Sequence, residues 1–144
     1  MSDIQFERRG AAGIITLNRP QALNAVTHDM VRALRAALEN WAGDPAVTRV
    51  VIMAAGGRAF SAGGDIRALT DLGKAGKVDE AVQFWRDEYP LNDYIKNYRK
   101  PYVALIDGIV MGGGVGISTH GSHRVAGDKF AFAMPEVGIG FFPD

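Results

Sequence analysis

Two glycine-rich segments could do chemistry with their backbone. FSAGGD at residues 60–65 and MGGGVG at residues 111–116 each follow an apolar run and precede a stretch with helical spacing. Glycine inside a helix is about 0.5–1 kcal/mol less favourable than alanine, so three consecutive glycines at 112–114 need a reason. A bare backbone lets a ligand approach closely, and the start of a helix offers N–H groups without a partner in the helix.

Together the two segments predict an oxyanion hole. One N–H group from each segment would bind the same carbonyl oxygen and stabilise the negative charge that develops on it. Loss of one such donor typically costs roughly 10²–10³ in rate. Two other interpretations stay open: the glycines allow tight turns and close packing, or they hold a phosphate. Neither segment has the spacing of a nucleotide-binding fingerprint.

Acidic residues in apolar surroundings are the candidate acids and bases. Glu136 lies in AMPEVGIG, and Asp144 follows it in GFFPD. An apolar setting disfavours the ionised form of a carboxyl group, so the two side chains could share proton transfers. An exposed loop glutamate and a solvated terminal aspartate are the alternative. Asp87 and Glu88 precede Pro90, where a disrupted helix could turn a carboxylate inward; a solvated helix face is the alternative there.

Other polar residues point to structural roles. Asp65 is either a helix cap or a catalyst, and Asp107 is expected to be a turn residue. His120 and His123 form an H-x-x-H pattern, but no neighbouring ligand completes it, so no metal site is predicted. The serines lack the G-x-S-x-G pattern of a serine hydrolase.

The elements that must position these groups alternate between strands and helices. Apolar runs predict buried strands, and apolar residues at helical spacing predict helices. Strands are expected at residues 4–10, 13–20, 49–55, 101–110, 123–128 and 129–134. Helices are expected over residues 28–44 with Thr27 as cap, from Asp65, over residues 78–98 with a kink or restart at Pro90, and after the triple glycine. Residues 56–65 are expected to be a loop and residues 73–77 a flexible link.

This alternation indicates the α/β class with a mainly parallel sheet, in which ligands bind at the carboxyl ends of strands. The 144 residues carry 16 basic and 16 acidic side chains, which argues against nucleic acid or an anionic membrane as partner. The absence of cysteine excludes disulfides and thiolate catalysis. No apolar run approaches the ~20 residues of a membrane span, and the N-terminus lacks the apolar core of a signal peptide.

The last residues, GIGFFPD, are apolar and glycine-rich, whereas domains more often end on an exposed helix or a polar tail. We therefore expect residues 1–144 to be one domain core that forms the N-terminal part of a longer domain.

Four segments in order, LNRPQALNAV, AFSAGGDI, KPYVALIDGIVMGGGVGIS and FAMPEVGIGFFPD, resemble the crotonase (enoyl-CoA hydratase/isomerase) superfamily over residues 14–144. FWRDEYPLNDYIKNYRKPYVALIDGIVMGGGVG and HGSHRVA resemble its branch of 3-hydroxyisobutyryl-CoA hydrolases. The resemblance implies a spiral of ββα units that binds an acyl-CoA, with the family's C-terminal helices absent from this chain. It implies no cofactor, because CoA is part of the substrate.

The resemblance also implies roles for particular residues. The N–H groups of Gly64 and Gly113 match the oxyanion hole, and Glu136 and Asp144 match the catalytic carboxylates of the hydrolase branch. The substrate-binding positions that it implies are Ala62, Gly63, Ile66, Glu88 and Gly112, with Ala62 and Ile66 beside the adenine.

One departure separates two activities. Hydratases of the family carry two glutamates; the second matches Glu136, but the first stands where this chain has Gly116. The expected reaction is therefore hydrolysis of a short-chain hydroxyacyl-CoA thioester such as 3-hydroxyisobutyryl-CoA, in valine breakdown. Enoyl-CoA hydration or isomerisation is one alternative, and a non-catalytic acyl-CoA-binding fragment is another, since the isolated chain could be inactive.

Beyond the acyl-CoA, the expected associations are a homo-oligomer or binding to a missing C-terminal part. The expected location is a bacterial cytoplasm, or the mitochondrial matrix after processing.

Overall fold

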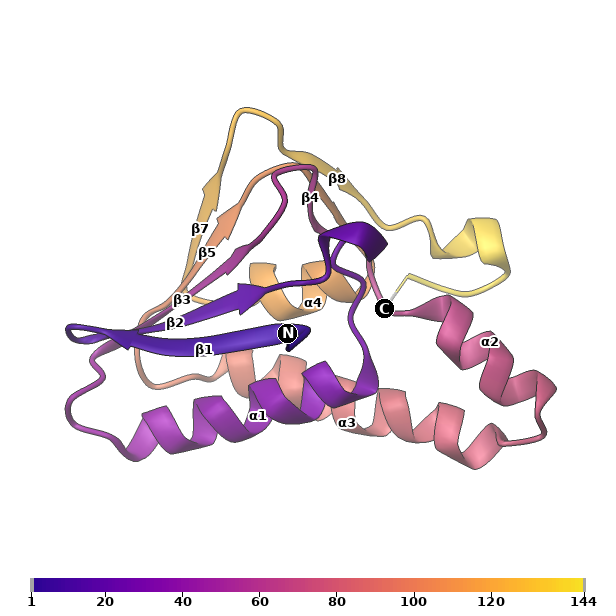
Figure 1. Ribbon diagram of the computed structural model, residues 1–144, viewed down its shortest axis with the longest axis horizontal. Helices are drawn as coiled ribbons and strands as arrows, with labels where there is room; N and C mark the ends of the chain where they lie inside the picture. The colour runs from indigo at the N-terminus through magenta and orange to yellow at the C-terminus, as the bar shows by residue number, and fades with distance from the viewer. Residues whose placement is uncertain (1, 144) are drawn as a thin grey trace.

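Strands and helices alternate along residues 2–143, the part of the chain that the computed structural model describes (Figure 1). The strands are β1 (Ile4–Arg9), β2 (Ala12–Leu17), β3 (Arg49–Ala54), β4 (Ala59–Ser61), β5 (Tyr102–Ile106), β6 (Ile109–Met111), β7 (His123–Ala126) and β8 (Ala131–Ala133). The helices are α1 (His28–Gly43), α2 (Ile66–Lys74), α3 (Val78–Lys96) and α4 (Gly113–Thr119), with short 3-10 turns η1 (Pro20–Ala22) and η2 (Glu136–Ile139).

The strands form two sheets. The larger has the order β1-β2-β3-β5-β7, in which β1 is antiparallel to β2 and every other pair is parallel. The smaller has the order β4-β6-β8 and is parallel throughout. The chain passes from the larger sheet to the smaller and then into a helix, first as β3-β4-α2 and again as β5-β6-α4. The predicted α/β class with repeated ββα units is confirmed.

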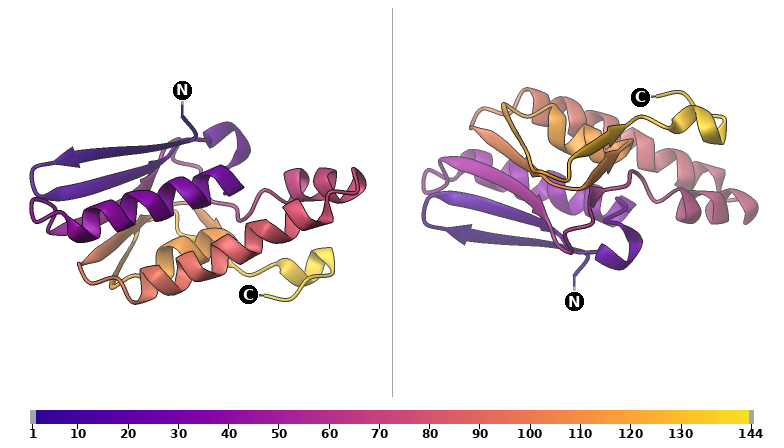
Figure 2. Two further views of the ribbon diagram at one scale, coloured as in Figure 1. Left: turned by 90° about the horizontal axis from the view of Figure 1, so that it is seen from below. Right: turned by 90° about the horizontal axis from the view of Figure 1, so that it is seen from above.

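Helix α1 follows the sequence prediction. Thr27 caps it, because its Oγ1 accepts a hydrogen bond of 3.2 Å from Met30 N. Its apolar residues at helical spacing face the core: Val31, Leu34 and Leu38 are buried, and Trp41 is partly buried. The stripe faces the larger sheet, and α3 lies beside α1 on the same side of it (Figure 2).

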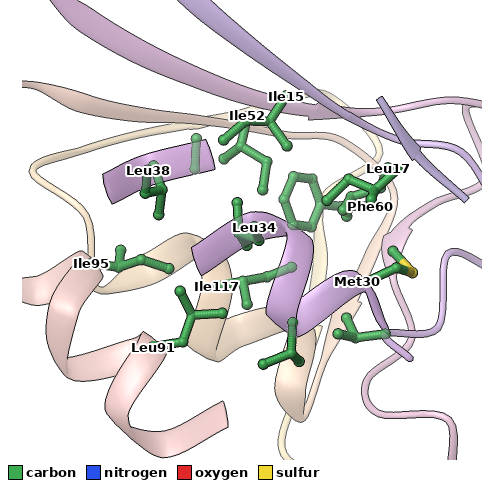
Figure 3. Close-up of a cluster of buried hydrophobic side chains, with 14 of the residues drawn as sticks. Ile15, Leu17, Met30, Leu34, Leu38, Ile52, Phe60, Leu91, Ile95 and Ile117 are labelled. Atoms are coloured by element: carbon green, nitrogen blue, oxygen red, sulfur yellow. The ribbon is translucent and has the colours of Figure 1, made fainter. Parts of the chain in front are cut away.

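The hydrophobic core joins these layers. Leu34 and Leu38 of α1 lie near Ile52 of the larger sheet, and Leu91 of α3 lies near Ile117 of α4 (Figure 3). Helix α4 contacts α3 and strands of both sheets, so the start of α4 is fixed from several directions.

Two strand predictions were wrong in their boundaries. Residues 56–65, expected to be a loop, contain β4, and residues 101–110, expected to be one strand, form β5 and β6 in different sheets. The break lies at Asp107, whose Oδ1 accepts hydrogen bonds of 3.0 Å from Gly108 N and from Lys129 N. Gly108 has φ of +75°, a conformation that favours glycine. The chain therefore turns at Asp107 and Gly108 as it passes from one sheet to the other, and the predicted turn role of Asp107 is confirmed.

Two helix predictions also need correction. Helix α3 is continuous from Val78 to Lys96 through Pro90, so the expected restart is wrong, while the alternative of a kink at Pro90 stays a prediction. Buried residues on both sides of the proline, Phe84 and Leu91 among them, share one packed face, and this packing outweighs the lost hydrogen bond. The flexible link expected at 73–77 is shorter, because α2 extends to Lys74.

Candidate active site

A pocket of about 550 Å³ lies between α2, the first half of α3, the start of α4 and the segment from Pro135 to Phe141. In Figure 1, α2 and the yellow end of the chain lie on the same side of the molecule. Residues of both segments line the pocket. Its lining contains eight of the nine predicted site residues: Ala62, Gly63, Gly64, Ile66, Glu88, Gly112, Gly113 and Glu136. The predicted Asp144 lies outside the described residues.

Residues from both glycine segments, Gly64 and Gly113, lie side by side at this pocket. Gly64 follows β4, and Gly113 is the first residue of α4, so its N–H has no acceptor within that helix. A Cβ built on Gly113 would lie 3.2 Å from Gly64 N, which shows how close the two segments are. No hydrogen bond among residues 2–143 uses the Gly64 N–H. The arrangement can bind one carbonyl oxygen from two sides.

Two glutamates lie against consecutive glycines. A Cβ on Gly112 would lie 2.9 Å from Glu136 Oε1, and a Cβ on Gly113 would lie 2.5 Å from Glu88 Oε1. Any side chain at either glycine would enter the space of a carboxylate. The glycines therefore bring backbone and carboxylates into one small volume, which answers why this segment has no side chains.

Helix α3 brings Glu88 to the pocket. Phe84 precedes Glu88 by one helical turn and Leu91 and Ile95 follow it, and all four residues are buried. Glu88 is 3% exposed. The inward carboxylate was predicted, but the reason is helical periodicity and not disruption at Pro90.

Asp87, the neighbouring candidate, points elsewhere. Its Oδ2 lies 2.6 Å from His28 Nε2 and 3.2 Å from Arg32 Nε, and its Oδ1 accepts a hydrogen bond of 2.9 Å from Gln83. The hydrogen bond with His28 is the main cause that lowers the pKa of Asp87 below its usual value of 3.8, and those with Gln83 and Arg32 add to it, against an opposing effect of burial. Asp87 joins α3 to α1 and does not line the pocket.

Glu136 begins the 3-10 turn η2 and is 8% exposed. Within residues 2–143, its buried Oε2 has no hydrogen-bond partner. A buried carboxylate oxygen without a donor is costly in a structural role, because its water is lost and not replaced. Such an oxygen is available to accept a proton or to attack a carbonyl carbon at the pocket.

An aromatic wall completes the pocket and was not predicted. Phe84 and Trp85 line it from α3, and Phe141 stacks on Trp85 with ring centroids 5.7 Å apart. Phe84 lies four residues before Glu88, so the helical spacing could have predicted that both side chains lie on the pocket side of the helix. Nothing local indicates Phe141, because its contact with Trp85 joins distant segments.

The other polar candidates have structural places. Asp65 caps α2 by accepting a hydrogen bond of 3.1 Å from Ala68 N. Among residues 2–143, no group of three or more histidine, aspartate or glutamate residues could hold a metal ion. No helix in that range is both long and apolar enough to cross a membrane.

Gly116, which separates two of the expected activities, lies against α3. A Cβ on Gly116 would lie 2.5 Å from Asn92 Nδ2 and 2.9 Å from its Oδ1. The Asn92 amide therefore fills the space that a side chain at position 116 would need.

The sequence and the fold both match known proteins. The chain is 57% identical over 143 residues to the mitochondrial 3-hydroxyisobutyryl-CoA hydrolase of Danio rerio, and 51% identical over 142 residues to that of Homo sapiens. These matches cover 99% of this chain but 37% and 36% of the two relatives, so the chain spans just over a third of their length.

Among solved structures, an enoyl-CoA hydratase from Rhodobacter sphaeroides matches with a TM-score of 0.96 and 50% identity over 99% of this chain and 42% of that one. A carnitinyl-CoA dehydratase from Mycobacterium thermoresistibile matches with a TM-score of 0.97 and 49% identity over 100% of this chain and 42% of that one. The model of one family, enoyl-CoA hydratase/isomerase, matches residues 12–144. The chain therefore belongs to the enoyl-CoA hydratase/isomerase (crotonase) family.

Proposed function

We propose that the protein hydrolyses a short-chain hydroxyacyl-CoA thioester, with 3-hydroxyisobutyryl-CoA as the substrate. The observation that carries the proposal is the pocket where Glu88 and Glu136 lie against Gly113 and Gly112, beside the Gly64 N–H. The names of the relatives, which are 3-hydroxyisobutyryl-CoA hydrolases, support this choice of acyl group.

In the proposed mechanism, the N–H groups of Gly64 and Gly113 bind the thioester carbonyl oxygen and stabilise the oxyanion of the tetrahedral intermediate. Glu136 acts in one of two ways. As a base it takes a proton from water, whose oxygen attacks the carbonyl carbon; the C–S bond then breaks and the thiolate receives a proton. As a nucleophile it attacks the carbonyl carbon directly, expels the thiolate and forms an anhydride that water opens.

The other two carboxylates have proposed supporting roles. Asp144 would orient the water or carry a proton between Glu136 and the leaving group. Glu88, against Gly113, would accept a hydrogen bond from the hydroxyl of the acyl group. A site built to hydrogen-bond a hydroxyl discriminates strongly against analogues that lack it.

The contact at Gly116 favours hydrolysis over hydration. Hydration in the family is expected to need a second glutamate at this position, and Asn92 fills the space for such a side chain. The solved hydratase and dehydratase relatives keep enoyl-CoA hydration as the second candidate. A role in binding alone would not explain why Glu136 buries a carboxylate oxygen without a hydrogen-bond partner, which costs stability.

The test is Glu136→Gln in the full-length protein, measured by thiol release from 3-hydroxyisobutyryl-CoA. We expect the variant to lose hydrolysis by a factor of roughly 10³ or more, and to bind the ester with nearly unchanged affinity, because the amide keeps the shape but accepts no proton. Crotonyl-CoA hydration, measured in parallel, tests the second candidate.

Glu39→Gln is the matched control, since Glu39 lies on the exposed face of α1 and pairs with Arg35. It should leave thiol release unchanged. Turnover retained by Glu136→Gln would overturn the assignment of Glu136. Hydration of crotonyl-CoA without thiol release would replace the proposed reaction with the alternative.

The location and assembly belong to the same proposal. Two of the relatives carry the word mitochondrial in their names, which supports the mitochondrial matrix, while the bacterial relatives of known structure are compatible with a bacterial cytoplasm. Acyl-CoA is the proposed partner, and self-association remains an expectation.

A further inference from the structure

The turn at residues 19–26 follows β2 and lies outside the pocket lining, yet it is bonded to the loop that carries Gly64. Leu23 O accepts a hydrogen bond of 2.9 Å from Ala62 N, Val26 N donates one of 2.8 Å to Gly63 O, and Val26 O accepts one of 2.9 Å from Asp65 N. The turn therefore holds the loop on both sides of Gly64.

The bond from Val26 has a direct consequence for the Gly64 N–H. Gly63 C=O and Gly64 N–H belong to one planar trans peptide, so they point in opposite directions. A hydrogen bond that fixes the carbonyl towards Val26 also fixes the direction of the N–H. The direction of this oxyanion donor is thus set by a segment outside the lining of the pocket.

The backbone of the turn is strained. Leu23 has φ of +50° and Asn24 has φ of +54°, and they are the only non-glycine residues with positive φ among residues 2–143. Asparagine tolerates this conformation, but leucine rarely adopts it. Such strain persists only where surrounding contacts over-determine the backbone, and it concentrates near functional sites.

Side chains supply those contacts. Asn24 is 1% exposed, its Oδ1 accepts a hydrogen bond of 2.8 Å from Arg19 N, and its Nδ2 donates to Ala55 O and Ala59 O, each at 2.9 Å. These bonds tie the turn to the end of β3 and the start of β4, which leads directly to Gly64.

Arg19 ties the turn to the other end of the loop. One of its guanidinium nitrogens donates to Ala25 O at 2.8 Å and to Asp65 Oδ2 at 3.1 Å. The second oxygen of Asp65 caps α2. Arg19 thereby joins the turn to the residue that follows Gly64.

We propose that the 19–26 turn is a clamp that aims the Gly64 N–H, with Asn24 and Arg19 as its positioning residues. The proposal rests on the proposed oxyanion hole and extends it to residues outside the pocket. Weakening the clamp should lower the rate of the chemical step more than it lowers the affinity for the ester, because only the alignment of the donor changes.

The first experiment is Asn24→Asp in the full-length protein, with thiol release from 3-hydroxyisobutyryl-CoA as the assay. The substitution keeps the size and the acceptor but places an oxygen opposite Ala55 O and Ala59 O. We expect kcat to fall about 10²-fold with KM changed less than about threefold, since misplacement by about 1 Å can cost this much. Asn97→Asp, at the exposed end of α3, is the matched control and should leave kcat unchanged.

A second readout is independent of turnover and of folding losses. In the Glu136→Gln background the ester stays bound, and the carbonyl stretching frequency in Raman difference spectra reports how strongly the oxyanion donors polarise it. Adding Asn24→Asp, or the milder Arg19→Met, should move this frequency back towards its value in free ester. Arg19→Met keeps the apolar stem, so it guards against a variant that fails to fold.

The outcomes distinguish failure of the clamp proposal from failure of the proposed thioester hydrolysis. An unchanged carbonyl frequency and unchanged kcat in both variants would overturn the clamp. A protein without thiol release, but with a frequency shift on binding that the turn variants reduce, would overturn the proposed reaction and keep the clamp.

Discussion

Gly113 shows how one missing methyl group shapes the site. The space that an alanine Cβ would take lies 2.5 Å from Glu88 Oε1 and 3.2 Å from Gly64 N. The carboxylate is the far end of a flexible side chain and can rotate away, whereas the Gly64 backbone cannot. An added methyl group should therefore disturb the chemistry more than the fold.

We expect Gly113→Ala to lower kcat by roughly 10²–10³, the range for loss of one oxyanion donor, with only a small change in the denaturation midpoint. Steady-state kinetics and urea unfolding measure the two effects. Gly43→Ala is the control, because nothing lies within 4 Å of its Cβ position at the end of α1. It should raise stability by about 0.4–1 kcal/mol. Full activity in Gly113→Ala would argue against Gly113 as a donor.

At the level of secondary structure, two adjacent residues of α3 have different roles: one lines the pocket and the other bonds to α1. Glu88 faces the pocket, while Asp87 bonds His28 and Arg32 of α1. Successive helical residues point about 100° apart, so one helix can serve two layers. The lowered pKa of Asp87 makes this link sensitive to acid.

We expect Asp87→Asn to lower the free energy of unfolding at neutral pH, and the difference from the unmodified protein to shrink as the pH falls. The folded-state pKa of Asp87 lies below the usual 3.8, so its stabilising contribution is complete above pH 3.8 and disappears as the pH falls through the folded-state value. Urea unfolding at several pH values between 7 and 2 measures this. Asp71→Asn, on exposed α2, should show no such convergence; a pH-independent difference for Asp87→Asn would contradict the assignment.

For the whole molecule, one hydrophobic core holds both sheets and three of the helices together. Leu34 is 1% exposed and lies in the cluster that joins α1, α3 and α4 to the strands (Figure 3). This shared core fixes α4 and the strands that precede the two glycine segments, and so contributes to holding those segments in place.

We expect Leu34→Ala to lower the free energy of unfolding by about 2–5 kcal/mol, as a buried leucine that leaves a cavity does. Denaturation followed by both tryptophan fluorescence and circular dichroism should give the same midpoint, because the layers share one core. Ala33→Ser, on a less buried face of α1, is the control. Separate midpoints for the two probes would show that the layers unfold independently.

Elements whose signals are local could be predicted from the sequence alone. The apolar stripe and Thr27 cap of α1, the apolar strands β2 and β3, and a glycine-rich helix start at Gly113 all follow from periodicity and propensity. The pairing of the two glycine segments followed from the rule that parallel strands present their carboxyl ends at one edge. Motif order supplied the family.

Features that depend on contacts between distant residues could not be predicted from the sequence and became visible only in the folded structure. Residues 101–110 divide into β5 and β6 because the two halves pair with strands of different sheets. The sequence of the segment alone predicts one continuous apolar strand. Three other features likewise join segments far apart in the chain: the Trp85–Phe141 stack, the contact of Gly116 with Asn92, and the hydrogen bonds of the 19–26 turn around Gly64. A local sequence pattern carries no record of such contacts, since packing energy is gained only when the whole core assembles.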